Sequence, residues 1–236
     1  MASQESAAAL QAQAHWDDAK YDRQALLDEL KAAYAAAPTD VGVMWRLTRA
    51  AYDVAHLNAT SAAQKKELIY YAYDLIQKAE PLGKHIAEVH NWVGIILSAI
   101  GDYEGTKVAI SNAYKIKEHW EESIRIQPDY PPTYFLLGNW CVRISDLSWI
   151  ERKAASVLFG SPPESSYDEA LKFLLKHEEL KPLSWKRVTI LIAEVYYKKK
   201  DWAKAKEWAE KTMSIEIKNE EDAKYQEDAK AMLKKL

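Results

Sequence analysis

The sequence predicts an all-α protein in which antiparallel helix pairs stack into a solenoid, and three observations support this prediction. Only 7 glycines and 8 prolines occur in 236 residues, which favours long helices over the many turns of a β-sandwich. Apolar residues make up 48% and charged residues 28%, as in a folded globular chain. Four degenerate copies of one helix-pair pattern follow one another along the chain, as they do in repeat proteins.

The repeated pattern is typical of the tetratricopeptide repeat, whose period is about 34 residues. Its first helix carries a large residue, then Leu-Gly, then Tyr, and its second helix carries small residues and ends near a proline. The best match follows Pro132 and contains Tyr134, Leu137, Gly138 and Cys141. A glycine lets two helices cross closely while bulky residues fill the space beside it. We therefore expect a tetratricopeptide-like solenoid.

The N-terminal part precedes the repeats. Residues 1–15, rich in Ala, Gln and Ser, are expected to form a flexible extension. A capping helix is expected over residues 16–37, because Leu26, Leu30 and Tyr34 recur at helical spacing and form an apolar stripe. All of residues 16–236 are expected to belong to a single solenoid domain.

Four helix pairs and a last helix follow. The pairs are expected at residues 45–52 with 67–79, residues 93–94 with 101–128, residues 134–141 with 167–182, and residues 192–196 with 201–212. The last helix, at about residues 219–235, begins with acidic residues and ends with lysines, which complements the helix dipole. It is expected to cap the solenoid, whose end repeat otherwise exposes an apolar face.

Three of the pairs are longer than the ideal period. The extra residues are expected around 57–64, 106–115 and 142–165, as longer helices or added loops. The longest insertion, about 142–165, contains Trp149 and is expected to be partly ordered. Capping boxes, in which a serine and an acidic or amide residue three positions later satisfy each other's backbone donors, are expected at Ser61 and Ser166.

Cysteine content and short motifs limit the catalytic and cofactor chemistry of the chain. The chain has one cysteine, Cys141, which excludes an intramolecular disulfide and a cysteine-based zinc site and fits a reducing compartment. Phosphate-binding loops, the nucleophile elbow and the HExxH zinc motif do not occur in the sequence. It holds no apolar run of about 18 residues. We expect no enzyme, no cofactor, no metal and no transmembrane anchor in this chain.

The net charge of −3 conceals a local excess of positive charge. Residues 181–211 carry more than twice as many Lys and Arg as Asp and Glu, although the rest of the chain is acidic. The electric field of such a stretch acts over about 10 Å, so it can attract an acidic partner locally. We therefore expect an acidic protein partner. We expect no nucleic acid partner. The predicted basic patch consists of Lys199, Lys200, Lys204 and Lys206.

Function in a solenoid is expected on the inner helices, which line an extended groove. Helix phases place polar and cationic residues there, where asparagine can bond a peptide backbone and arginine can bind a carboxylate. The predicted groove residues are Arg46, Asn91, Phe135, Asn139, Arg143, Arg187, Tyr197 and Lys198. The expected ligand is an extended acidic peptide segment.

Several strings in the chain are more specific than the repeat pattern requires. They are Trp45-Arg46-Leu47, Gly101-Asp102-Tyr103-Glu104-Gly105, residues 112–119, Gly138-Asn139-Trp140-Cys141, and Phe159-Gly160-Ser161-Pro162-Pro163. Over residues 40–182 the chain resembles the regulator of microtubule dynamics family. The resemblance implies a cytoplasmic protein of the cytoskeleton, spindle and spindle poles. Such a protein would bind tubulin, microtubules or a microtubule-associated partner and support microtubule dynamics and chromosome segregation.

A second hypothesis is a lipid-binding or lipid-transfer module at organelle contacts. Its apolar pocket would be lined by Ile95, Phe135, Trp140, Trp149 and Ile190. The tryptophans at repeat positions are expected in the core instead; they are Trp45, Trp92, Trp120 and Trp202.

Overall fold

The computed structural model describes residues 5–18, 20–159 and 163–236, and the part it describes contains twelve α-helices and no β-strand. The chain divides into two compact units, unit 1 (residues 1–126) and unit 2 (residues 127–236), where the sequence predicts one domain. Unit 1 contains α1 (Ala7–Asp17), α2 (Arg23–Ala36), α3 (Val41–Ala55), α4 (Ala62–Ala79), α5 (Ala87–Glu104) and α6 (Thr106–Ile126). Unit 2 contains α7 (Pro131–Ser145), α8 (Trp149–Phe159), α9 (Tyr167–Leu180), α10 (Lys186–Lys198), α11 (Trp202–Ser214) and α12 (Glu220–Leu233).

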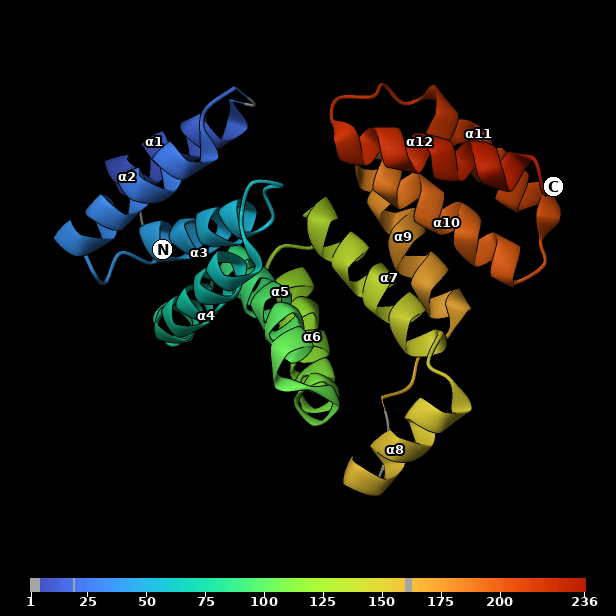
Figure 1. Ribbon diagram of the computed structural model, residues 1–236, viewed down its shortest axis with the longest axis horizontal. Coiled ribbons are helices and arrows are strands. Elements are labelled where there is room, and N and C mark those ends of the chain that lie inside the picture. The colour runs from blue at the N-terminus through green and yellow to red at the C-terminus, as the bar shows by residue number, and fades with distance from the viewer. Residues whose placement is uncertain (1–4, 19, 160–162) are drawn as a thin grey trace. The chain divides into compact units, whose positions relative to one another are not determined.

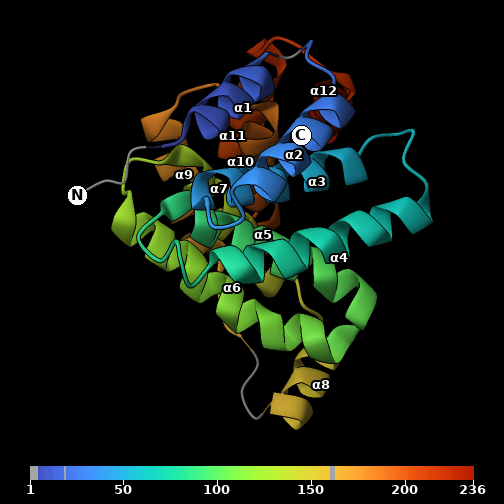
Figure 2. The same cartoon turned by 90° about the vertical axis from the view of Figure 1, so that its left-hand side faces the viewer.

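The helices of unit 1 form repeat-like pairs in two layers (Figure 1 and Figure 2). Helix α3 packs on α4 and α5 packs on α6, which confirms the first two predicted pairs. Helices α1, α3 and α5 are neighbours in one layer, and α2 and α4 each contact the first helix of the pair that follows. Residues 106–115, expected as an insertion, lengthen α6.

Helix α1 corrects the expected flexible extension over residues 1–15. Its Ala9 and Ala12 are buried, and a Cβ atom added at Gly42 of α3 would lie 3.1 Å from the Ala9 Cβ atom. Ser6 caps α1 by accepting a hydrogen bond from the Ala9 backbone N–H at 3.2 Å. Helices α1 and α2 therefore form a further helix pair before the first one that the sequence predicts.

The helices of unit 2 repeat the same arrangement. Helix α7 packs on α9, and α10 packs on α11, which confirms the third and fourth predicted pairs. Helix α12 contacts both α10 and α11, as expected of the last helix. The core contains Ile190, Ala193, Ala209 and Ala229, with Trp208 packed against it. Helix α8 lies in the long insertion, and Figure 1 shows it extending away from the other helices of unit 2.

The helix pairs depend on the glycines that the repeat pattern singles out. A Cβ atom at Gly94 of α5 would lie 2.3 Å from the Trp120 indole nitrogen, and one at Gly138 of α7 would lie 2.6 Å from Leu174 Cγ. Any larger residue at these positions would clash with Trp120 or Leu174 and disturb the packing of its helix pair. Among the helix starts, the capping box at Ser61 is confirmed, and Ser166 caps α9 by accepting from the Glu169 backbone N–H at 3.1 Å.

Candidate functional site

The predicted groove residues of unit 1 are buried. Arg46 on α3 is only 4% exposed, and its guanidinium donates hydrogen bonds to both carboxylate oxygens of Glu5, at 2.7 and 3.1 Å. The same guanidinium lies 4.1 Å from the centre of the Trp45 ring. Asn91 on α5 is also buried, and its backbone carbonyl accepts a hydrogen bond from the Trp120 indole at 3.2 Å. Both residues therefore serve packing within unit 1 rather than an open binding surface.

Helix α1 covers the face of α3 on which Arg46 lies. Trp16 at the end of α1 donates a hydrogen bond from Nε1 to Asp53 Oδ2 at 2.8 Å, and the Arg49 guanidinium lies 4.0 Å from the Trp16 ring centre. Burial raises the pKa of Asp53, while the Trp16 hydrogen bond and the Arg49 charge oppose this rise. The inward face of α3 is thus a closed contact between helices.

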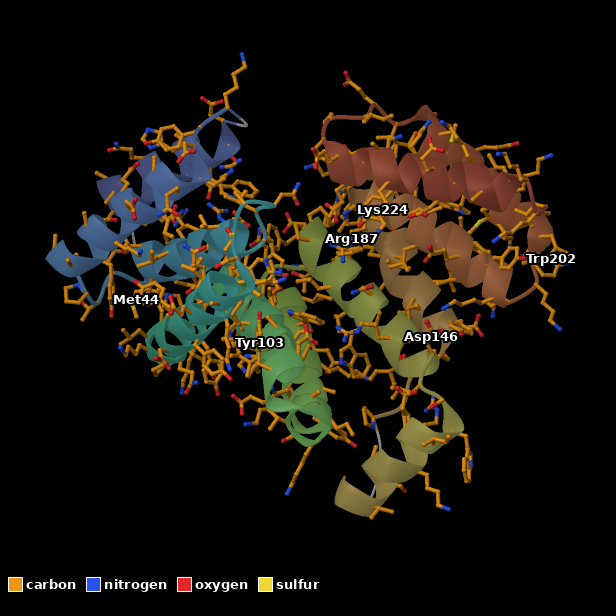
Figure 3. All side chains as sticks on the ribbon, viewed as in Figure 1. Met44, Tyr103, Asp146, Arg187, Trp202 and Lys224 are labelled. Atoms are coloured by element: carbon orange, nitrogen blue, oxygen red, sulfur yellow. The ribbon has the colours of Figure 1, made fainter. Side chains whose placement is uncertain are left out.

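The inner layer of unit 2 starts with α7. Phe135 is buried against Trp185, with ring centres 4.6 Å apart, and the Arg187 guanidinium lies 5.0 Å from the Phe135 ring centre. Arg187 also forms an ion pair of 3.8 Å with Glu221 of α12 (Figure 3). Further along α7, Asn139 is half-buried and Arg143 is exposed. Of these predicted residues, Phe135 belongs to the core and the polar ones lie nearer to solvent.

At the end of this layer, Lys198 of α10 meets acidic groups. Asp146, the capping residue directly after α7, accepts hydrogen bonds from Lys198 and from the Tyr167 hydroxyl, the latter at 2.6 Å. The hydrogen bond to Asp146 raises the pKa of Tyr167 to about 12. Burial raises the pKa of Glu194, one turn before Lys198, and the Lys198 charge partly offsets this. The face therefore carries both signs of charge, and its predicted cation Lys198 is paired with Asp146.

The basic patch is exposed and partly paired. Lys199 forms an ion pair of 2.6 Å with Asp168 of α9, and Lys204 forms one of 3.5 Å with Asp201. Lys200 lies in the turn between α10 and α11 with φ of 61°, and both Lys200 and Lys206 are exposed. The patch thus lies at the end of unit 2 where the α10–α11 turn emerges.

An exposed tryptophan adjoins this patch, contrary to the expectation that Trp202 is a core residue. Trp202 is 48% exposed, and its ring lies edge-on to Tyr197 at 5.0 Å between ring centres (Figure 3). Trp202 directly follows the capping residue Asp201, and in the sequence this position matches one that is packed in the repeat pattern. Trp45 and Trp120 are buried as expected, and Trp92 is half-buried.

The lipid-binding hypothesis gains no support from the described residues. Phe135, Trp140 and Ile190 are buried in unit 2, Trp149 is 71% exposed on α8, and Ile95 belongs to unit 1. A surface pocket of about 230 Å³ in unit 1 has a mixed lining, in which His56, Lys65 and Asp102 stand beside Ile69 and two alanines. That volume is below the roughly 300 Å³ at which small-molecule sites begin.

Part of the long insertion lies outside the residues that the structure describes. Ser161, Gly160 and Pro162 of the family-like string lie outside the described residues. Of the helices that the structure describes, none combines the length and the apolar character that crossing a bilayer requires.

Comparison with known proteins places the chain among named relatives. The family model described as regulator of microtubule dynamics protein 1-3 matches residues 9–236. Regulator of microtubule dynamics protein 1 of Mus musculus is 40% identical over 159 residues, which cover 67% of this chain and 52% of the mouse protein. Regulator of microtubule dynamics protein 3 of Xenopus laevis is 37% identical over 153 residues, 65% of this chain and 33% of the frog protein. The chain spans about half the length, or less, of these relatives.

Solved structures share the fold at low identity. A tetratricopeptide protein of Thermus thermophilus matches with a TM-score of 0.60 and 14% identity, covering 87% of this chain and 90% of that one. PilF of Pseudomonas aeruginosa matches with a TM-score of 0.59 and 14% identity, covering 97% and 86%. These similarities establish the tetratricopeptide-like fold and do not extend to function.

Proposed function

The chain belongs to the regulator of microtubule dynamics family, and from this premise we propose that it is a non-enzymatic module that binds microtubules. The observation that carries the proposal is the family match over residues 9–236, which includes helices of both units. The proposal includes direct binding to tubulin or to a microtubule-associated partner. It also includes a role in microtubule dynamics and chromosome segregation at the cytoskeleton and spindle.

The binding surface that we propose lies on unit 2. Its cations are Arg143, Arg187, Lys198 and the basic patch. Asn139 lies one turn before Arg143 on α7, and Tyr197 directly precedes Lys198. Arg46 and Asn91 are left out of it because both are buried in unit 1. Acidic C-terminal tails of tubulin are the extended segments that such cations would bind.

The ion pairs within unit 2 are compatible with this role. Lys199 and Asp168 form a pair on the surface, where the net free energy of an ion pair is about 0–1 kcal/mol. An incoming acidic segment therefore replaces one weak partner with another and gains from the density of its own charges. Lys200 and Lys206 are exposed and add to the attraction. The resulting binding is fast and depends strongly on salt.

Co-sedimentation with stabilised microtubules tests the proposal. The protein is expected to sediment at low salt, to sediment less as salt rises, and to bind more weakly after the tubulin tails are removed by protease. No sedimentation at any salt concentration would contradict direct binding. Binding that ignores both salt and tail removal would contradict the electrostatic mechanism.

A charge-reversed variant tests whether the proposed surface of unit 2 binds the microtubule. Lys200→Glu/Lys206→Glu is expected to lower microtubule affinity by roughly tenfold, because two attractive contacts become repulsive. The matched control is Lys78→Glu/Lys107→Glu, which reverses two exposed lysines of unit 1 and the same total charge. Equal losses in the two variants would show that only net charge matters and would reject the unit 2 surface.

A further inference from the structure

Helix α8 carries the three most exposed large apolar side chains of the described residues. Val157 is 79% exposed, Ile150 73% and Trp149 71%. At 3.6 residues per turn, these three and Lys153 fall within an arc of about 100° on one face of the helix. Lys153 Nζ lies 4.9 Å from the centre of the Trp149 ring. A clustered apolar face of this kind on a folded surface marks an interaction site.

The direction of this face is fixed by contacts at the start of α8. The Ser148 backbone N–H donates to Glu151 Oε2 at 2.7 Å, and the Glu151 N–H donates to Ser148 Oγ at 3.3 Å, which makes a capping box. Arg152 donates to the Ile144 carbonyl at 2.8 Å and so ties α8 to the end of α7. Ala155, on the opposite side of α8 from Lys153, is buried. The apolar face therefore points outward without being needed for packing.

Helix α8 starts at the same end of unit 2 as the basic patch. Asp146, three residues before α8, bonds both Tyr167 of α9 and Lys198 of α10 (Figure 3). The next lysine, Lys199, pairs with Asp168 of α9. The C-terminal ends of α7 and α10 and the N-terminal end of α9 thus meet where α8 begins.

We infer that α8 is the apolar docking element with which this protein binds the microtubule surface, while the basic patch binds the acidic tails. This inference rests on the proposed function and divides it into two contacts. Tryptophan is enriched among the residues that dominate interface energy, and Lys153 within the apolar face complements the acidic surface of tubulin.

A second copy of the chain is a poorer occupant for this face. Lys153 lies near the middle of α8, so antiparallel pairing of two α8 helices would place two lysines side by side in an apolar contact. An acidic partner surface would attract Lys153 instead.

The two contacts respond differently to salt, and this separates them in a co-sedimentation assay. The triple variant Trp149→Ser/Ile150→Ser/Val157→Ser is expected to lower affinity roughly tenfold or more at every salt concentration, with the salt dependence unchanged. Lys200→Glu/Lys206→Glu is expected to reduce the salt dependence itself. The matched control, Leu10→Ser/Leu57→Ser/Leu82→Ser, removes three exposed leucines of unit 1 and is expected to bind like the unmodified chain.

A milder variant covers the case in which the triple variant misfolds. Lys153→Glu keeps the apolar residues and is expected to lower affinity several-fold, with the circular dichroism spectrum unchanged. If the unmodified chain does not sediment, the proposed function fails and this inference fails with it. If the unmodified chain sediments and both α8 variants bind equally well, only this inference is overturned. Light scattering that shows a dimer lost in the triple variant, with microtubule binding intact, would assign α8 to self-association and overturn it as well.

Discussion

The inward face of α3 in unit 1 and the end of unit 2 around α8 carry similar polar patterns and use them differently. On α3, Arg46 and Asp53 are covered by α1 and bonded to Glu5 and Trp16. At the end of unit 2, Lys199 and its neighbours are exposed and pair with carboxylates that are also exposed. A charged residue on a repeat helix is therefore available to a partner only where no other helix of the chain covers it.

Lys186 extends this comparison, because it is a covered cation within unit 2. Its side chain is fully buried, and Nζ donates to the Thr212 carbonyl and to Gln226 Oε1, both at 2.7 Å, and to the Ile215 carbonyl. Burial lowers the pKa of Lys186, and the charge of Asp222 opposes this. Lys186 therefore ties α10 to the end of α11 and to α12.

The largest expected effect on stability comes from substituting Lys186. Lys186→Met keeps most of the length of the side chain but leaves one buried and two partly buried acceptors without their donor, so we expect the free energy of unfolding to fall by about 3 kcal/mol. Urea unfolding measures it. Lys206→Met, an exposed lysine of the same unit, is the control and is expected to change stability by less than about 0.5 kcal/mol. Similar losses of unfolding free energy in the two variants would show that burial by other helices does not make Lys186 more important for stability than Lys206.

Substituting Arg46, the covered cation of unit 1, is expected to have the next largest effect on stability. Arg46→Ala removes the paired hydrogen bonds to Glu5 and the stacking on Trp45, and we expect it to lower the free energy of unfolding by about 1–2 kcal/mol. Glu5→Ala should reproduce part of this loss, since Glu5 is partly exposed. Lys107→Ala, exposed on α6, serves as the control. A null result for Arg46→Ala would indicate that α1 does not hold the face of α3.

The sequence predicts the helix pairs well, because their signals are local. Gly94 and Gly138 mark close helix crossings, and the structure places a large side chain against each of them. Helix α1 was not predicted because its packing uses Ala9 and Ala12, which form no strong apolar stripe. Small residues of this kind are as common in flexible segments as in close helix contacts.

The candidate site was less predictable than the fold, because it depends on contacts between distant residues. The pairing of Lys199 with Asp168 and of Arg46 with Glu5 joins residues 31 and 41 positions apart, which no local spacing encodes. The outward face of α8 could have been found from the sequence, since Trp149, Ile150 and Val157 recur on one side of a short helix that begins at Ser148. That signal indicates an apolar face, and only the coordinates show that no other described element of unit 2 covers it.

A histidine pair between α5 and α6 is expected to have the smallest effect on stability. It makes the stability of the covered region depend on pH, unlike that of the exposed end of unit 2. The Nδ1 atoms of His90 and His119 lie 3.0 Å apart, so one ring donates and the other accepts. Burial lowers the pKa of His119; the charge of Glu80 raises it and that of His90 lowers it further. The folded chain therefore binds the His119 proton less tightly than the unfolded chain does.

The sign of the pH dependence follows from this difference. As the pH falls through the ordinary pKa of histidine, about 6.5, the unfolded chain takes up a proton that the folded chain resists, so stability is lost. We expect the free energy of unfolding to fall between pH 7.5 and 5.5 on account of His119, by less than the losses expected for Lys186→Met and Arg46→Ala. His119→Gln should remove this part of the slope, whereas Lys200→Gln at the uncovered end of unit 2 should leave it unchanged, because lysine does not titrate in this range. Parallel profiles for the unmodified chain and His119→Gln would mean that His119 does not resist protonation in the folded chain.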